Sequence, residues 1–310
     1  MRHLIRRLAQ IVPTMLGALV LVFLVMRVLP GDPAISLLGT AATPEAVAVL
    51  RRELGVDRPL FEQFIAYLSG ALRLDLGQSL ALRAPVTQLV LDAVPHTLLL
   101  TLGGTLVAAA IGVPLGAAAA LRRGTWLDYG ASVGALLGVS VPVFVWGLVL
   151  LLVFSLHWRL FPTAGAGTTP GGVLRALVLP SIATGFFLAG VVSRITRASI
   201  LQMLGQDFAR TARAKGLGET AVVGRHVLRN AIIPILTVVG LNIGTLLSGA
   251  IVAETVFTRP GLGRLALDAI LARDYPVIQG VILVSSFAVL LLNLIVDLLY
   301  GLADPRVRAT

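Results

Sequence analysis

The chain of 310 residues has no cysteine, a single lysine and few charged residues. Without cysteine it can form neither a disulfide bond nor a thiolate metal site. A phosphate-binding P-loop ends in Gly-Lys followed by Ser or Thr, whereas Lys215 stands between Ala214 and Gly216, so this motif for ATP hydrolysis is excluded. Only 13% of the residues are charged and 57% are hydrophobic, with a mean hydropathy of +0.93. This balance excludes an ordinary water-soluble domain and indicates a bilayer protein.

Recognisable catalytic motifs are also missing. The sequence contains no HExxH zinc motif and no G-x-S-x-G nucleophile motif. Its histidines, His3, His96, His157 and His226, are scattered at the borders of apolar segments, and none is spaced from another like a metal ligand. We therefore predict no catalytic residue and no metal site, which disfavours an intramembrane enzyme.

Long apolar runs dominate what is present. A membrane-spanning helix needs about 20 apolar residues, and strand-like alternation is absent from these runs. The sequence therefore predicts an all-α integral membrane protein with a single domain over residues 1–310. Its six predicted spans are residues 8–29, 97–121, 131–156, 173–193, 231–253 and 277–298.

The arginines predict the orientation of these spans, because short positively charged loops stay in the cytoplasm. One side of the predicted topology carries fourteen basic and four acidic residues, and the remainder of the chain balances with eleven of each. Both termini are thus predicted in the cytoplasm, and residues 30–96, 157–172 and 254–276 outside. The basic excess explains a pI near 11.3 without a nucleic-acid partner, since it forms no continuous patch with stacking aromatics. The fourteen basic residues are Arg2, Arg6, Arg7, Arg122, Arg123, Arg194, Arg197, Arg210, Arg213, Lys215, Arg225, Arg229, Arg306 and Arg308.

The long first outer loop, residues 30–96, is predicted to be structured. Thr43 and Pro44 form a helix-start signature before EAVAVLRRE, and a second amphipathic stretch, LFEQFIAYLSGALR, follows Pro59. We expect two short helices here. The apolar face of the second is expected to rest on the bilayer surface or on the ends of the spanning helices.

A polar insert over residues 207–234 interrupts the apolar runs. Its pattern predicts a helix that starts at Asp207 and stops at Gly216, followed by a second helix. Ala209, Ala212 and Gly216 recur at helical spacing and predict a nearly flat face, with Arg210 and Arg213 on an adjacent strip. We expect this helix to lie against another protein.

Several separate motifs resemble a known family. The insert, RTARAKGLG followed by RHVLRNAIIP, is similar to the cytoplasmic "EAA" loop of type I ABC importer permeases of the dipeptide, oligopeptide and nickel branch. The opening RRLAQIVPTMLGALVLVFLVMRVLPGDPA, the phrase RRELGVDRPLFEQF, the outer AETVFTRPGLG and the final VDLLYGLADPRVR resemble the first of that branch's two permease subunits. The chain departs from the general motif, because Arg210-Thr211-Ala212 replaces Glu-Ala-Ala and Pro234 comes later than usual.

The resemblance implies a MetI-like permease fold and a set of partners. These are a homologous second permease subunit, two ABC ATPase subunits that bind ATP and Mg, and an extracytoplasmic substrate-binding protein, all at a bacterial inner membrane. No cofactor is expected in this chain itself. The resemblance assigns contact with the ATPase to residues of the insert, namely Arg210, Thr211, Ala212, Arg213, Ala214, Lys215, Gly216, Leu217 and Gly218.

Polar residues in or beside the spans are few. No central pair of buried charges suggests ion coupling, which disfavours a secondary transporter working alone. Asn242, Glu254 and Asn293 are candidates for a path or gate, although interhelical hydrogen bonding also explains the two asparagines.

Glycine and proline within the spans predict close helix contacts and kinks. The glycines recur at four-residue spacing and the prolines stand inside apolar runs. These residues are Gly112, Gly116, Gly134, Gly138, Gly240 and Gly244, with Pro114, Pro142, Pro180 and Pro234.

The predicted function is that of a non-catalytic permease subunit of an ATP-driven importer, with peptides as the expected substrate. Nickel or another small solute remains an alternative, because substrate selection in such importers rests heavily on the separate binding protein.

Overall fold

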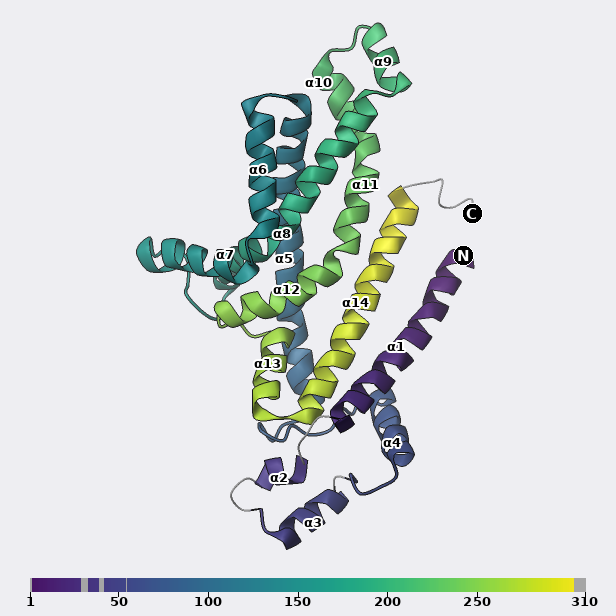
Figure 1. The fold of residues 1–310 in the computed structure, drawn as a ribbon, viewed down its shortest axis with the longest axis vertical. Helices are drawn as coiled ribbons and strands as arrows, with labels where there is room; N and C mark the ends of the chain where they lie inside the picture. Colours follow the sequence, from purple (N-terminus) through teal and green to yellow (C-terminus); the bar gives the residue numbers. More distant parts are fainter. Residues whose placement is uncertain (1, 29–32, 39–41, 54, 304–310) are drawn as a thin grey trace. The chain divides into compact units, whose positions relative to one another are not determined.

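The computed structural model describes residues 2–28, 33–38, 42–53 and 55–303. Regular structure in this described part is helical, apart from an isolated antiparallel bridge between Gln78 and Pro85. The chain divides into two compact units, one of residues 1–96 with 260–291 and one of residues 97–259 with 292–310. Figure 1 labels the helices.

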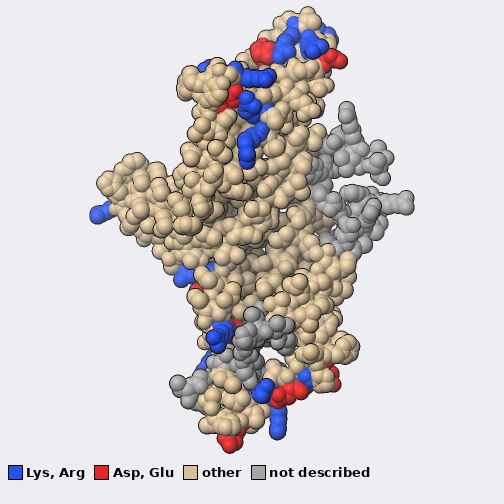
Figure 2. All heavy atoms as spheres, viewed as in Figure 1, with Lys and Arg blue, Asp and Glu red and all other residues tan. Residues whose placement is uncertain are grey.

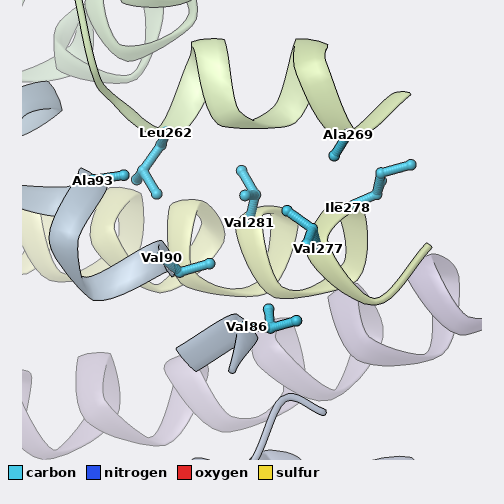
Figure 3. Packing of buried hydrophobic residues seen from close by; sticks show 8 residues of the cluster. All are labelled: Val86, Val90, Ala93, Leu262, Ala269, Val277, Ile278 and Val281. Carbon is cyan, nitrogen blue, oxygen red and sulfur yellow. The ribbon is translucent and has the colours of Figure 1, made fainter. Parts of the chain in front are cut away.

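The first unit contains the segment that precedes α5, and the beginnings of two long helices. Its core joins the start of α5 to α13 and the start of α14, and Figure 3 shows Leu262 and Ala269 of α13 facing Val277 and Val281 of α14. Val90 of α5 belongs to the same cluster. The helices of this unit are α1 (Arg2–Val28), α2 (Pro33–Leu38), α3 (Pro44–Glu53), α4 (Leu60–Leu72), the first part of α5 (Val86–Leu121), α13 (Leu262–Ala272) and the first part of α14 (Tyr275–Ala303).

The two short helices predicted within residues 30–96 are confirmed as α3 and α4. Thr43 accepts a hydrogen bond from the Ala46 amide at 3.2 Å, as an N-cap residue does. Helix α4 rests on α1, where Phe23 contacts the rings of Phe64 and Tyr67 at centroid distances of 5.4 and 6.1 Å. Helix α2 was not predicted, because six residues are too few for helical periodicity to be visible.

A buried aspartate holds the segment before α5 to the start of α14. Asp274 Oδ2 accepts hydrogen bonds from the Ser79 hydroxyl at 2.6 Å and from the Ala81 amide at 2.9 Å. The segment before α5 thus gains a tertiary anchor that does not need a disulfide bond.

The second unit is built around α8, a helix of 35 residues whose middle is almost entirely buried. Glycines let two neighbouring helices approach it closely: a Cβ on Gly112 of α5 would lie 2.7 Å from the Ala189 carbonyl oxygen, and one on Gly138 of α6 would lie 2.7 Å from that of Phe186. The predicted close approach is confirmed at Gly112 and Gly138, whereas it is wrong for Gly134, which has no such neighbour within 4 Å among the described residues. The elements of this unit are the rest of α5, α6 (Trp126–Ser140), α7 (Val143–Leu150), a π-helical segment (Leu151–His157), α8 (Pro170–Leu204), α9 (Asp207–Ala214), α10 (Glu219–Ala221), a second π-helical segment (Val222–Val227), α11 (Leu228–Leu241), α12 (Ile243–Val256) and the end of α14.

Long apolar helices support the membrane assignment. Four stretches within the described residues are long and apolar enough to cross a bilayer: Val86–Leu121, Pro170–Leu204, Glu219–Leu241 and Tyr275–Val296. A bent pair, Trp126–Ser140 with Val143–His157, gives a fifth if it counts as one span. The predicted first span, residues 8–29, lies partly outside the described residues, as do the side chains of Arg2, Arg6, Arg7, Arg306 and Arg308. The count of six and the placement of the termini therefore stay predictions.

Two predicted spans are interrupted in the structure. The run 131–156 breaks at Val141, whose φ of −86° and ψ of 123° are extended, and the two sides are bent by 104°. Pro142 is the cause, because the residue before a proline is displaced from helical geometry and proline offers no amide donor.

The run 231–253 breaks at Asn242, between α11 and α12. Asn242 has φ −94° and ψ 0°, and its side-chain amide donates to the Val238 carbonyl at 2.8 Å. Asparagine side chains compete with the backbone for helical hydrogen bonds, which explains an interruption inside an apolar run.

Candidate functional site

Helix α9 runs from Asp207 to Ala214 and is followed by Lys215 as its C-cap residue, after which the chain turns through Gly216. Gly216 has a φ of +80°, a left-handed conformation that glycine adopts without strain. A helical stretch resumes at Glu219 and continues through α10 and the second π-helical segment into α11. The predicted helix, glycine turn and second helix are confirmed.

The flat alanine face of α9 packs inside this chain. Ala209 is fully buried and Ala212 is 6% exposed, and both pack within this chain, in a cluster with Ile200, Val222 and Val227. The face is covered because the turn at Gly216 brings the following segment back against α9. Small residues at helical spacing predict close approach, but they do not say which segment approaches.

An ion pair closes the turn that follows α9. Arg213 donates two hydrogen bonds to Glu219, from Nε at 3.0 Å and from Nη2 at 2.7 Å. The hydrogen bonds that Arg213 donates to Glu219 raise the pKa of Arg213 above its ordinary value. Arg213 thus braces the turn rather than projecting freely.

The exposed surface of α9 is the part available to another protein. Phe208 is 37% exposed, and the side chain of Arg210 is 74% exposed, with only a 3.8 Å contact to Asp207. Figure 2 shows basic side chains gathered over this end of the second unit. Of the other predicted contact residues, Thr211, Ala214, Lys215, Gly216 and Gly218 are also exposed, whereas Leu217 is partly buried.

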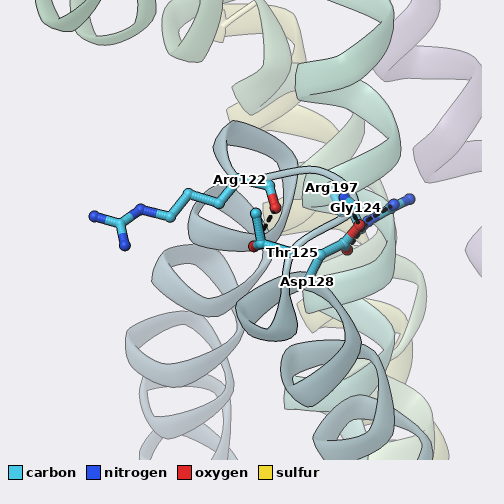
Figure 4. A network of polar contacts seen from close by, with 5 residues as sticks. All are labelled: Arg122, Gly124, Thr125, Asp128 and Arg197. Atoms are coloured by element: carbon cyan, nitrogen blue, oxygen red, sulfur yellow. Dashed lines mark hydrogen bonds and ion pairs between the residues drawn. The ribbon is translucent and has the colours of Figure 1, made fainter.

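A second ion pair, which sequence reasoning missed, links α6 to α8 near the same end of the unit. Asp128 accepts two hydrogen bonds from Arg197, from Nε at 2.6 Å and from Nη2 at 2.8 Å, and a third from the Gly124 amide at 3.0 Å. Figure 4 shows these groups converging on the turn between α5 and α6, with the Arg122 side chain extending away from it. The pair holds that turn to the helix that leads into α9. An acidic residue beside an otherwise basic loop was the available signal.

The residues predicted for a path or gate do not form one cluster. Asn242 lies at the break between α11 and α12, Asn293 is exposed on α14, and neither is hydrogen-bonded to Glu254 within the described residues. Glu254 is fully buried near the end of α12 and accepts a hydrogen bond from the Thr97 hydroxyl at 2.6 Å.

Arg259 lies in the turn after α12 and was not singled out from the sequence. It is fully buried, and its amide donates to the Glu254 carbonyl at 2.8 Å. In the described part of the chain its Nε, Nη1 and Nη2 atoms have no hydrogen-bond partner. The sequence signal for Arg259 was its charge inside the motif AETVFTRPGLG, a motif in which only Glu254 was predicted as a candidate.

Comparison with known proteins gives the wider context. The chain is 40% identical to the dipeptide transport system permease protein DppB of Escherichia coli K12, in an alignment that covers 99% of each chain. It is 42% identical to the glutathione transport system permease protein GsiC of Escherichia coli O6:H1, again over 99% of each chain.

Solved structures show the same fold at lower sequence identity. A structure of the MetNI methionine ABC transporter in inward-facing conformations matches with a TM-score of 0.59 and 17% identity, covering 70% of this chain and 97% of that chain. A crystal structure of an amino acid ABC transporter with histidines matches with a TM-score of 0.51 and 18% identity, covering 71% and 94%. These neighbours confirm the predicted MetI-like, all-helical fold.

Family models account for nearly the whole sequence. Residues 1–101 match the N-terminal model of binding-protein-dependent transport system membrane components, and residues 112–309 match the model of the inner membrane component itself. The chain belongs to the family of inner membrane components of binding-protein-dependent transport systems.

Proposed function

We propose that this chain is a permease subunit of an ATP-driven importer and forms half of a translocation path for peptides. The observation that carries the proposal is the end-to-end similarity to dipeptide and glutathione permeases at 40% and 42% identity. Both of these relatives act on small peptides, which supports a peptide substrate here.

The chain lacks a P-loop, which supports a partner as the subunit that hydrolyses ATP. We assign that contact to the exposed face of α9, whose Phe208 and Arg210 are accessible while Ala209 and Ala212 anchor the helix in the fold. A helix fixed in this way can pass a displacement to α8 and α11, because the cluster around Ala209 includes Ile200 of α8 and Ala231 of α11.

The remaining partners are proposed from the family resemblance. The importer would consist of this chain, a homologous second permease subunit, two ATPase subunits that bind ATP and Mg, and an extracytoplasmic binding protein. The chain would lie in a bacterial inner membrane with both termini in the cytoplasm, where its basic loops are expected.

Alternative substrates and mechanisms give different results in one assay. The complete transporter is reconstituted in proteoliposomes, and uptake of labelled dialanine, glutathione and nickel is compared with ATP and with ADP. Dialanine or glutathione uptake that requires ATP supports the proposal. ATP-dependent uptake of nickel alone would replace the peptide assignment, and accumulation that does not need ATP would indicate a secondary transporter.

The contact surface is tested in the same assay with two charge reversals. Arg210→Glu on α9 is expected to lower uptake about tenfold, the effect of losing one charged contact. Arg122→Glu is the matched control, because its side chain also extends from the basic end of this unit but lies outside α9 (Figure 4). Equal effects of the two substitutions would contradict the assignment to α9.

A further inference from the structure

Arg259 is the most anomalous charged residue in the described part of the chain. Its guanidinium is fully buried, and its three nitrogen atoms have no hydrogen-bond partner there. A buried guanidinium without a hydrogen-bond partner is unfavourable, because it has lost its hydration and gained no hydrogen bond in exchange. Since arginine does not lose its proton in proteins, the cost persists at every physiological pH.

Glu254 lies close to Arg259 but does not satisfy it. The Arg259 amide donates to the Glu254 carbonyl at 2.8 Å, while one carboxylate oxygen of Glu254 accepts from Thr97 at 2.6 Å. Burial lowers the pKa of Arg259, and the charge of Glu254 opposes this shift. The Glu254 carboxylate therefore interacts electrostatically with the Arg259 guanidinium, although the two groups form no hydrogen bond.

The backbone beside Arg259 is strained as well. Thr258 has a φ of +48°, a left-handed conformation that is rare for a β-branched residue. Phe257 just before it is 2% exposed and packs on Leu150 and Leu179, so the turn is anchored on that side. Strain and an unsatisfied charge both raise the free energy of this arrangement relative to one in which the turn has opened.

We propose that Arg259 is a carboxylate-binding residue of the translocation path, which takes the C-terminal carboxylate of the peptide when the turn over residues 257–259 opens. The inference rests on the proposed function. A guanidinium presents a fork of donors that matches a carboxylate in a bidentate pair. The adjacent charge of Glu254 favours a singly charged carboxylate over a multiply charged phosphate.

Opening of the turn by the ligand follows from the same energetics. In this structure the turn over residues 257–259 is closed, and the Arg259 guanidinium has no hydrogen-bond partner among the described residues. In the open arrangement the guanidinium can pair with the carboxylate of the ligand. The ligand therefore binds the open arrangement better and shifts the population toward it. The unsatisfied charge thus makes the turn responsive to the substrate without any titrating group.

The test compares a free dipeptide with its C-terminal amide in the reconstituted complete transporter. Arg259→Met keeps most of the side-chain volume and removes the charge, and Arg259→Lys keeps the charge but loses the fork. Arg175→Met, at an exposed arginine early in α8 of the same unit, is the matched control. The binding protein is identical in every sample, so its own preference for the free acid cancels when variants are compared.

The expected readout is the ratio of kcat/KM for the free dipeptide to that for the amide. Arg259→Met is expected to lower this ratio about tenfold or more, as the loss of a charge-assisted pair would. Arg259→Lys should lie between it and the wild type, and Arg175→Met should leave the ratio unchanged. The thermal unfolding midpoint of Arg259→Met should equal or exceed that of the wild type, because replacing a buried charge with a hydrophobic side chain is often stabilising.

Two results would overturn the inference. One is an unchanged ratio in Arg259→Met while ATP-driven uptake continues. The other is an equal loss of both substrates, which is expected if Arg259 pairs instead with a residue of the second permease. Absence of ATP-dependent peptide uptake by the wild-type transporter would instead remove the proposed function itself, so the two failures are distinguishable.

Discussion

Ala212 and Ala214 lie on the same helix, α9, but differ in burial. Ala212 is 6% exposed and packs against the segment that follows Gly216, whereas Ala214 is exposed. A substitution at position 212 therefore perturbs the fold before it perturbs any partner.

The first prediction compares the same substitution at these two positions. Ala212→Asp places an unpaired carboxylate in an apolar cluster and is expected to cost about 3 kcal/mol or more of unfolding free energy. Ala214→Asp should stay within about 0.5 kcal/mol of the wild type. Thermal unfolding in detergent provides the measurement, and similar midpoints for the two variants would contradict the burial of Ala212.

Gly216 allows the effect of backbone conformation to be separated from that of contacts. A Cβ added there would have no atom within 4 Å, so the cost of a substitution comes from its φ of +80°. Gly216→Ala should lose about 1–2 kcal/mol of unfolding free energy. Gly216→Asn should lose less, because asparagine tolerates this conformation better.

Thermal midpoints of the two Gly216 variants, together with the number of peptides transported per ATP hydrolysed, test this ranking. If alanine were as well tolerated as asparagine, the turn could not have the conformation described.

The approach of α5 to α8 is a property of whole elements. A Cβ on Gly116 would clash with the Ser193 carbonyl and would lie 2.7 Å from Thr196 Cβ, whereas Gly134 of α6 has open space around it. Gly116→Val is therefore expected to cost about 1–3 kcal/mol through overpacking, and Gly134→Val should fold with little loss. The yield of monodisperse protein and its unfolding midpoint distinguish them, and a larger loss at position 134 would be inconsistent with this arrangement.

The Asp128–Arg197 pair links two elements, and its removal should loosen the turn between α5 and α6. Asp128→Asn keeps the shape but weakens two charge-assisted hydrogen bonds, at an expected cost of about 1–3 kcal/mol. Asp207→Asn is the control, because that side chain is 98% exposed and its contact with Arg210 is 3.8 Å long. Protease cleavage between residues 122 and 126 should accelerate in the first variant only.

Sequence periodicity predicted most helices of this chain and missed their interruptions. The sequence predicts a kink at Pro142. The bend angle of 104° between α6 and the following segment depends on tertiary packing, which a local sequence pattern does not predict. The break at Asn242 depends on a side chain that bonds its own helix, and asparagine alone does not predict that choice.

The candidate site was predictable to a similar extent. The helix and glycine turn of residues 207–216 follow from local signals, because capping and the left-handed glycine are local properties. The burial of Ala212, the Arg213–Glu219 pair and the isolation of Arg259 are tertiary facts, so the sequence left them open.

The chain as a whole is a membrane component that depends on partners. Its family membership and MetI-like fold agree with what the sequence motifs implied. The single-domain assignment, the six-span count and the cytoplasmic termini stay predictions, since the structure shows two compact units, describes no side chains for residues 1–11 and describes the chain only as far as residue 303.

The measurement that tests the account most directly is uptake of labelled dipeptide into proteoliposomes made with and without the ATPase subunits. The account predicts concentrative uptake only when the second permease, the ATPases, the loaded binding protein and ATP are all present. Uphill accumulation of dipeptide in vesicles that contain this chain but no ATPase would contradict it.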